Sequence, residues 1–132
     1  MENNCCKINY IKSDFFFGSM LIFDMLKTTE KNMLYYTQII FIRKDQESTF
    51  HSFEDQVLPL LSRHSGELIY RVRPAASDVL TSAFDHPYEI HIVSFTDRKS
   101  FEDYRDDPER LQYMYLKDKS VDRVILIEGN ML

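Results

Sequence analysis

Two segments in the middle of the chain share an alternating pattern that favours a β-hairpin with two unlike faces. Residues 67–73 and 88–95 both change between apolar and mixed side chains with period two. Opposed residues of an antiparallel pair share a face, so the apolar rows pack together and the mixed rows lie together. The mixed row is too charged for an ordinary core and too apolar for plain solvent, which predicts a shared cavity or a subunit interface. The apolar row is Leu68, Tyr70, Val72, Tyr88, Ile90 and Ile92, and the mixed row is Ile69, Arg71, Arg73, Glu89, His91, Val93 and Phe95.

The segment before this hairpin predicts one strand and one helix. Residues 34–43 are rich in β-branched and aromatic side chains, as strands are. Apolar residues then recur at helical spacing over 50–64. Pro59 lies inside this stretch and predicts a kink near Gln56. Gly66 follows it and predicts a left-handed C-cap.

The segment after the hairpin loop predicts a second helical region and a last strand. The loop itself is expected to cover residues 75–86. Thr96 or Asp97 is a suitable cap for the next helix, and Asp107 followed by Pro108 predicts a further helix start. Residues 120–128 read as the fourth strand. The expected buried side of the later helix is Leu111 with Met114 or Tyr115.

The resulting order is β-α-β-β-α-β, which predicts an α+β, ferredoxin-like fold. Two helices would cover one face of a four-stranded antiparallel sheet. The other face has no cover within the chain, and we expect it to carry Ile69, Val93 and Phe95. An exposed apolar patch normally marks an interface. We therefore predict a homodimer through this uncovered sheet face, with a barrel and a central cavity between the two sheets.

Composition and cysteine usage narrow the class of protein. The 132 residues fit one domain, and a net charge of −5 without a basic run argues against nucleic-acid binding. The only cysteines, Cys5 and Cys6, are adjacent, which excludes a disulfide framework and fits the cytoplasm. We expect an N-terminal extension at 1–33, accessory or mobile, a domain at 34–129 and a tail at 130–132. The apolar run at 15–26 contains Asp24 and is too short to span a bilayer, so no membrane anchor is predicted.

Several stretches resemble a family of unknown function in the dimeric α/β-barrel superfamily, the domain-of-unknown-function 1330 family. They are residues 36–42, 57–71, 94–101, 107–110 and 124–129. The resemblance implies the dimeric barrel, and the superfamily includes cofactor-independent monooxygenases, muconolactone isomerases, haem-binding enzymes and proteins with no known reaction. His64 in the His-Ser-Gly turn matches a His-Gly-Gly turn of that family, with Ser65 in place of the first glycine.

The mixed row supplies the candidate site. Arg71 is predicted to hold an anionic or carbonyl oxygen, and His91 to act as the proton carrier. Arg73, Glu89 and Gln38 are expected as further ligand-binding members of the same cavity. The alternative is cross-strand or cross-dimer ion pairing of the arginines with Glu89, and a packing role for His91. His64, at a helix end, is read mainly as a partner of the helix dipole.

No nucleophile or nucleotide motif is present. With three glycines in the chain, a phosphate-binding loop and a dinucleotide fingerprint are excluded, and no G-x-S-x-G elbow occurs. The histidines lack zinc-type spacing, so no metal and no cofactor is predicted. We predict a small-ligand-binding dimer, with a cofactor-independent monooxygenase or isomerase acting on a small aromatic or polyketide-like compound as the alternative. Whether the protein is an enzyme stays open at this point.

Overall fold

The structure is a computed structural model that describes residues 33–132. Predictions for the first 32 residues, including the adjacent cysteines and the apolar run, lie outside the described residues. The elements, in chain order, are β1 (Leu34–Ile42), α2 (Glu47–Val57), η3 (Leu58–His64), β2 (Gly66–Val72), η4 (Ala76–Asp78), β3 (Glu89–Phe95), α3 (Arg98–Arg105), α4 (Pro108–Leu111), α5 (Met114–Ser120) and β4 (Val121–Gly129).

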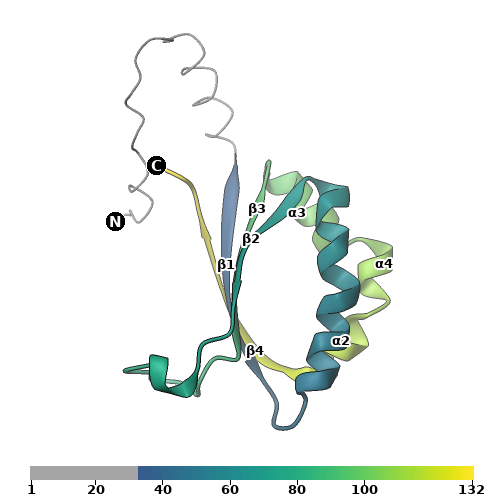
Figure 1. Cartoon of the computed structure of the whole chain (residues 1–132). Helices are drawn as coiled ribbons and strands as arrows, with labels where there is room; N and C mark the ends of the chain where they lie inside the picture. Colours follow the sequence, from purple (N-terminus) through teal and green to yellow (C-terminus); the bar gives the residue numbers. More distant parts are fainter. Residues whose placement is uncertain (1–32) are drawn as a thin grey trace.

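The four strands form one antiparallel sheet in the order β2-β3-β1-β4. The α-helices and η3 lie on one side of it, and the loop between β2 and β3, which contains η4, projects from the other side (Figure 1). The predicted ferredoxin-like α+β fold is therefore confirmed. We call the helix-covered side of the sheet the inner face and the opposite side the outer face.

The first helix ends where proline predicts a break. α2 stops at Val57, and the tighter η3 continues with Pro59 in its first turn. The predicted left-handed cap is wrong by one residue, because Ser65 adopts the positive φ of 58°. Gly66 has a different role: a Cβ there would lie 2.7 Å from the ring of Phe95. The strand can therefore approach the core only with glycine at this position.

The two later caps are as predicted. The Asp97 side chain accepts a hydrogen bond from the Ser100 backbone N–H at the start of α3. Asp107 does the same for Glu109, with Pro108 as the first residue of α4. The predicted buried side of the later helix is wrong in part, because Leu111 and Tyr115 are 50% and 65% exposed.

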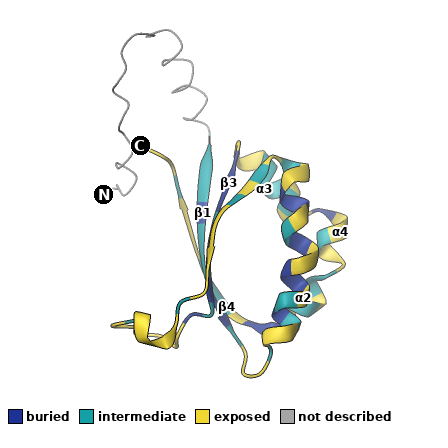
Figure 2. Ribbon diagram, in the orientation of Figure 1, coloured by how far each residue is buried: buried dark blue, intermediate teal, exposed yellow. Residues whose placement is uncertain are grey.

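The mixed row of the hairpin lies on the inner face, which reverses the expected arrangement. Most of β3 is buried as a result (Figure 2). Val93 and Phe95, expected as dimer anchors, are each 2% exposed and pack with Tyr36 and Leu61 in a core cluster. A burial this complete on the helix side excludes them from an interface through the outer face. A second core cluster joins Ile40, Phe50 and Val121.

A register shift in β2 explains why the two rows do not run straight. Leu68 pairs with Val93, whereas Tyr70 already pairs with Ile92, so Ile69 is the extra residue of a β-bulge. Leu68 therefore packs against the core, although strict alternation assigned it to the same row as Tyr70. Ile69, the third expected anchor, is 38% exposed at the bulge.

The outer face carries the apolar row except for Leu68 and Tyr88, since Tyr88 packs against Phe50 of α2. Tyr70, Val72 and Ile127 are 61%, 49% and 51% exposed. Ile90 and Ile92 alternate with the buried residues of β3 and are half-buried. An apolar surface of this kind on an uncovered sheet face is the usual mark of an interaction site.

Candidate functional site

Three strands bring the predicted site residues together on the inner face. In the sheet register, Gln38 of β1 and Arg71 of β2 both lie opposite His91 of β3. Glu89 precedes His91 by two residues, so both side chains point toward the helices. The sheet therefore places a carboxylate, an imidazole and an arginine next to one another by register alone.

Glu89 is the centre of this group, which we call the inner-face cluster. Arg71 donates from Nε to Oε1 at 3.0 Å and from Nη2 to Oε2 at 3.3 Å, a two-pronged ion pair. Arg73 donates to Oε2 through Nε at 3.1 Å and also through Nη2. His91 Nε2 lies 2.8 Å from Glu89 Oε1. All the acceptor capacity of this 1% exposed side chain is thus directed at protein donors.

A fifth residue completes the inner-face cluster from the helix side. Glu54 of α2 is 4% exposed, and its Oε2 lies 3.4 Å from His91 Nε2. Within the described part of the chain, the Glu54 carboxyl accepts no hydrogen bond. Two buried carboxyls therefore face one imidazole nitrogen, and only Glu89 has arginine partners at hydrogen-bond distance.

The two carboxyls differ in their acid strength. Burial raises the pKa of Glu54 to about 7, with the charge of Glu89 adding to the effect and Arg71 opposing it. Burial also raises the pKa of Glu89, but hydrogen bonds from Arg71, His91 and Arg73 outweigh it and hold the value at about 2. Burial lowers the pKa of His91, against the effect of its bond to Glu89. Near neutral pH the Glu89 carboxyl is therefore ionised, and burial favours the neutral form of the His91 imidazole.

The predicted residues are thus neighbours, but not in the predicted place. The site was expected in a barrel cavity on the uncovered face, and the structure puts it beneath α2. The reason is charge compensation: Glu89 can be buried because two arginines and His91 surround it. The cross-strand pairing of Arg71 and Arg73 with Glu89 is the alternative interpretation stated above, and the geometry follows it.

Two residues of β1, the candidate Gln38 and its neighbour on the same face, Tyr36, behave differently. Gln38 is half-buried on the same face as His91, and no described residue forms a hydrogen bond with its side chain. Tyr36 belongs to a separate group, because its hydroxyl donates to Glu128 at 3.0 Å and its ring stacks on Phe101. Burial, followed by this hydrogen bond, raises the pKa of Tyr36 to about 12.

His64 has a tethering role between two helical segments. Its Nε2 lies 2.6 Å from Asp107 Oδ2, to which Arg63 also donates at 3.1 Å. The His64 hydrogen bond, with further help from the Glu109 backbone N–H and Arg63, lowers the pKa of Asp107 to about 2. The end of η3 is thereby fixed to the start of α4. This agrees with the structural interpretation of His64.

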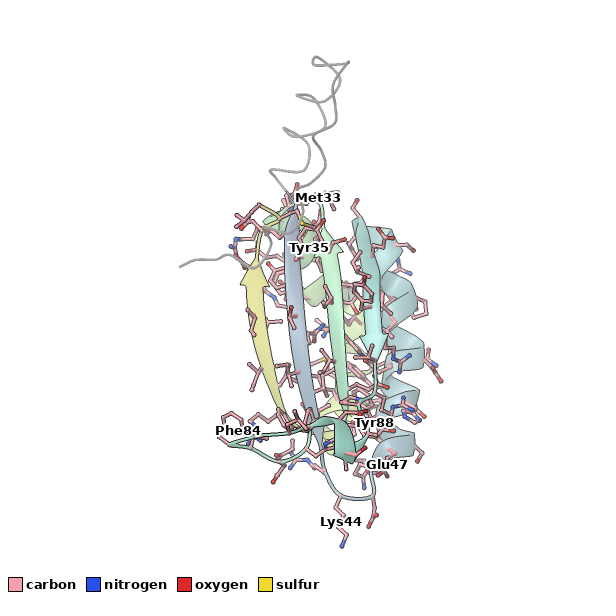
Figure 3. All side chains as sticks on the ribbon, turned by 60° about the vertical axis from the view of Figure 1, so that its left-hand side comes forward. Met33, Tyr35, Lys44, Glu47, Phe84 and Tyr88 are labelled. Carbon is pink, nitrogen blue, oxygen red and sulfur yellow. The ribbon has the colours of Figure 1, made fainter. Side chains whose placement is uncertain are left out.

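The outer face holds a pocket that the sequence did not predict. It has a volume of about 640 Å³. Ile39, Ile90 and Ile125, which are cross-strand neighbours, line its sheet side, and the loop after η4 lines the other. Figure 3 shows Phe84 on this loop, where the chain crosses one end of the sheet. The size lies within the range of small-molecule sites, about 300–1,000 Å³.

A stack of side chains fixes the loop beside the pocket. The Arg123 guanidinium lies 4.5 Å from the ring centre of Phe41 and 4.8 Å from that of Phe84. The two rings also meet edge to face, with centres 6.2 Å apart. Phe41 is consequently 4% exposed although it points to the outer face. The loop is therefore anchored to both β1 and β4.

Glu54 and the pocket are the two features that sequence reasoning missed. The signal for Glu54 was present, since it falls on the apolar stripe formed by Phe50, Phe53 and Val57, where a charge is out of place. A buried carboxylate on such a stripe requires a partner, and His91 was the available one. The pocket depends on how a polar loop folds back over the sheet, which no periodicity in residues 75–86 encodes.

No family model and no curated protein matches this chain. Several solved structures do match. A protein of unknown function from Rhodopseudomonas palustris, RPA0582, has a TM-score of 0.66 and 11% identity, covering 87% of this chain and 95% of that one. A dimeric protein of unknown function with a ferredoxin-like fold, from Bacteroides fragilis, has a TM-score of 0.54 and 10% identity, covering 74% of this chain and 95% of that one. SnoaB of Streptomyces nogalater, a cofactor-independent oxygenase, has a TM-score of 0.54 and 11% identity, covering 75% of this chain and 92% of that one.

These likenesses define the class of protein by its fold. The chain is an α+β protein with a ferredoxin-like fold, as in the protein from Bacteroides fragilis. The resemblance to one particular family of unknown function stays a prediction. Among residues 33–132, no helix is long and apolar enough to cross a membrane.

Proposed function

We propose that the protein is a homodimer of the dimeric α/β-barrel type that packs two copies through their outer faces and binds a small, largely apolar ligand. The observation that carries the proposal is the coincidence of the exposed apolar row with a pocket of about 640 Å³ on the same face. A second copy would remove the apolar row from water and close the open side of the pocket. The ferredoxin-like dimer from Bacteroides fragilis supports this assembly.

The assembly is tested by placing a charge on the outer face. Val72→Lys introduces a lysine into the interface, where it loses water without gaining a partner, so sedimentation should shift from twice the chain mass to the chain mass. Leu111→Lys is the matched control, because Leu111 is 50% exposed against 49% for Val72 but lies on α4. A parent protein that stays monomeric at high concentration contradicts the proposal.

Ligand binding is tested with the apolar dye anilinonaphthalene sulfonate. We expect saturable fluorescence enhancement that Ala83→Phe reduces, because Ala83 lines the pocket and a phenyl ring would fill it. Ala76→Phe in η4 adds the same ring in the same loop, at an exposed position outside the lining. Equal dye binding by both variants would show that the pocket is not the binding site.

Catalysis on a small aromatic or polyketide-like compound, as a cofactor-independent monooxygenase or isomerase, is the second candidate function. It is favoured by the presence of the oxygenase SnoaB among chains of this fold. Against it, the pocket and His91 lie on opposite faces of the sheet. In this candidate His91 exchanges a proton and Arg71, Arg73, Glu89 and Gln38 position the substrate from the inner face. The expected result is that His91→Gln no longer converts such a compound, while sedimentation still shows the mass of the dimer.

We further propose that the protein works in the cytoplasm. The basis is cysteine usage: the two cysteines are neighbours in the chain and offer no disulfide framework. Cell fractionation with an antibody against the full chain tests this directly, and recovery from a secreted fraction contradicts it.

A further inference from the structure

The Glu54 carboxyl is the least satisfied charged group of the inner-face cluster. Its side chain is 95% buried, and its ion-pair contact in the described structure is His91 Nε2 at 3.4 Å. That nitrogen carries at most one proton, and Glu89 Oε1 is nearer, at 2.8 Å. Buried charges in proteins are paired or coordinate metals. Glu89 keeps its arginine donors in either case, so the Glu54 carboxyl is the one left without a donor when His91 bonds to Glu89.

We propose that Glu54, Glu89 and His91 form a binding site for one divalent transition-metal ion, with Zn²⁺ and Mn²⁺ as the ions best matched to one imidazole and two carboxylates. The three ligand atoms lie within 4.8 Å of one another, and all three residues are buried. Metal bonds of about 2.0–2.2 Å hold neighbouring ligand atoms about 3.0–3.5 Å apart. The observed separations of 2.8 and 3.4 Å from His91 Nε2 lie close to that range.

The fold supplies rigid ligands for such an ion. Glu89 and His91 are two residues apart on β3, so they project from one face of a central strand, and Glu54 faces them from the middle of α2. Arg71 and Arg73 hold the Glu89 carboxylate in place, as outer hydrogen-bond partners hold metal ligands. Two carboxylates balance the charge of the ion, while the two guanidinium groups oppose it, so we expect micromolar rather than nanomolar affinity.

Arg71 and Arg73 are the members of the inner-face cluster that reach solvent. The side chains of Arg71 and Arg73 are 33% and 48% exposed, and both contact Glu89. Three protein ligands leave a further coordination position for water or for a small oxygen ligand, as in zinc sites that are not purely structural. The site is independent of the outer-face pocket, so its fate and that of the proposed ligand-binding function are separable.

The tag-free full chain is first treated with a chelator to remove bound ions. It is then titrated in a calorimeter with ZnCl₂ and, separately, with MnCl₂. We expect one saturable site per chain for at least one of the two ions, and a higher melting temperature in its presence. Glu54→Gln should weaken binding by at least about tenfold, because it replaces a charged ligand with a neutral one of the same shape. His91→Gln should do the same.

Matched controls come from neighbouring exposed residues. Asp55→Asn changes the next residue of α2, and His86→Gln changes an exposed histidine of the loop; neither should alter the affinity. If His91→Gln does not fold, Glu54→Gln decides, since no described hydrogen bond depends on the Glu54 carboxyl. Absence of saturable binding of both ions up to about 1 mM, or binding that Glu54→Gln leaves unchanged, overturns the proposal.

Discussion

The two faces of the sheet differ in how they combine polarity with burial. The inner face buries Glu89 and His91 beside an apolar core, with Glu54 of α2 facing them, while the outer face exposes Tyr70 and Val72. Charges are tolerated inside because they compensate one another at hydrogen-bond distance, and apolar groups remain outside where a second copy can cover them. The polarity of a strand face therefore does not by itself predict whether that face meets the helices. Whether its charged side chains find hydrogen-bond and ion-pair partners there also matters.

The largest expected effect comes from removing the centre of the inner-face cluster. Glu89→Ala leaves the arginines and His91 without their common acceptor, and breaking a buried ion pair in this way costs about 3–5 kcal/mol. Glu67→Ala, at an exposed position of β2, should change stability by no more than about 0.5 kcal/mol. Urea unfolding of both variants measures the difference. A loss below about 1 kcal/mol for Glu89→Ala would mean that the cluster contributes no more than surface ion pairs.

This comparison also shows how far the sequence determines the molecule. Element types and order, the helix break at Pro59 and the caps at Asp97 and Asp107 follow from local chemistry, and all are present in the structure. The clustering of Arg71, Glu89 and His91 follows from strand alternation. The face on which they lie does not, because it depends on which side of the sheet packs against the helices, through contacts between residues far apart in the chain.

A pair of valines sharpens the contrast between faces. Val93→Ala removes buried methyl groups and leaves a cavity, so we expect a loss of about 2 kcal/mol. Val72→Ala removes the same groups from a side chain that is 49% exposed in the single chain, and should cost about 0.5 kcal/mol or less in the monomer. Unfolding is measured at protein concentrations low enough to dissociate the dimer. Equal losses would mean that the outer face is also part of the monomer core.

Acid should act on a third region, the tether between η3 and α4. The pKa of Asp107 is about 2 in the folded protein, below its ordinary value. A lowered carboxyl pKa contributes stability that is present above the ordinary value and is lost as pH falls through the folded one. We therefore expect stability to decline between about pH 4 and about pH 2, and Asp107→Asn to flatten that decline. An unchanged acid profile in this variant would assign the decline to other carboxylates.

The smallest effect is expected at the bulge. Deleting Ile69 joins Leu68 to Tyr70 and leaves both on their present faces, because Ile69 is the unpaired residue. We expect a loss on the order of 1 kcal/mol and a retained inner-face cluster. Deleting Ile92 instead reverses the faces of Val93 and Phe95, and should prevent folding. Circular dichroism and urea unfolding distinguish the two, and a folded Ile92 deletion would contradict the register described here.

The stack of Phe84 on Arg123 and Phe41 has a practical consequence. The chain contains no tryptophan, so its intrinsic emission comes from tyrosine alone. Phe84 is 55% exposed at the pocket and beside the face where a second copy would pack. Phe84→Trp would thus introduce a single tryptophan whose emission wavelength reports the solvent exposure of residue 84. The same emission signal would then follow opening of the loop, ligand binding in the pocket and association of two copies in real time.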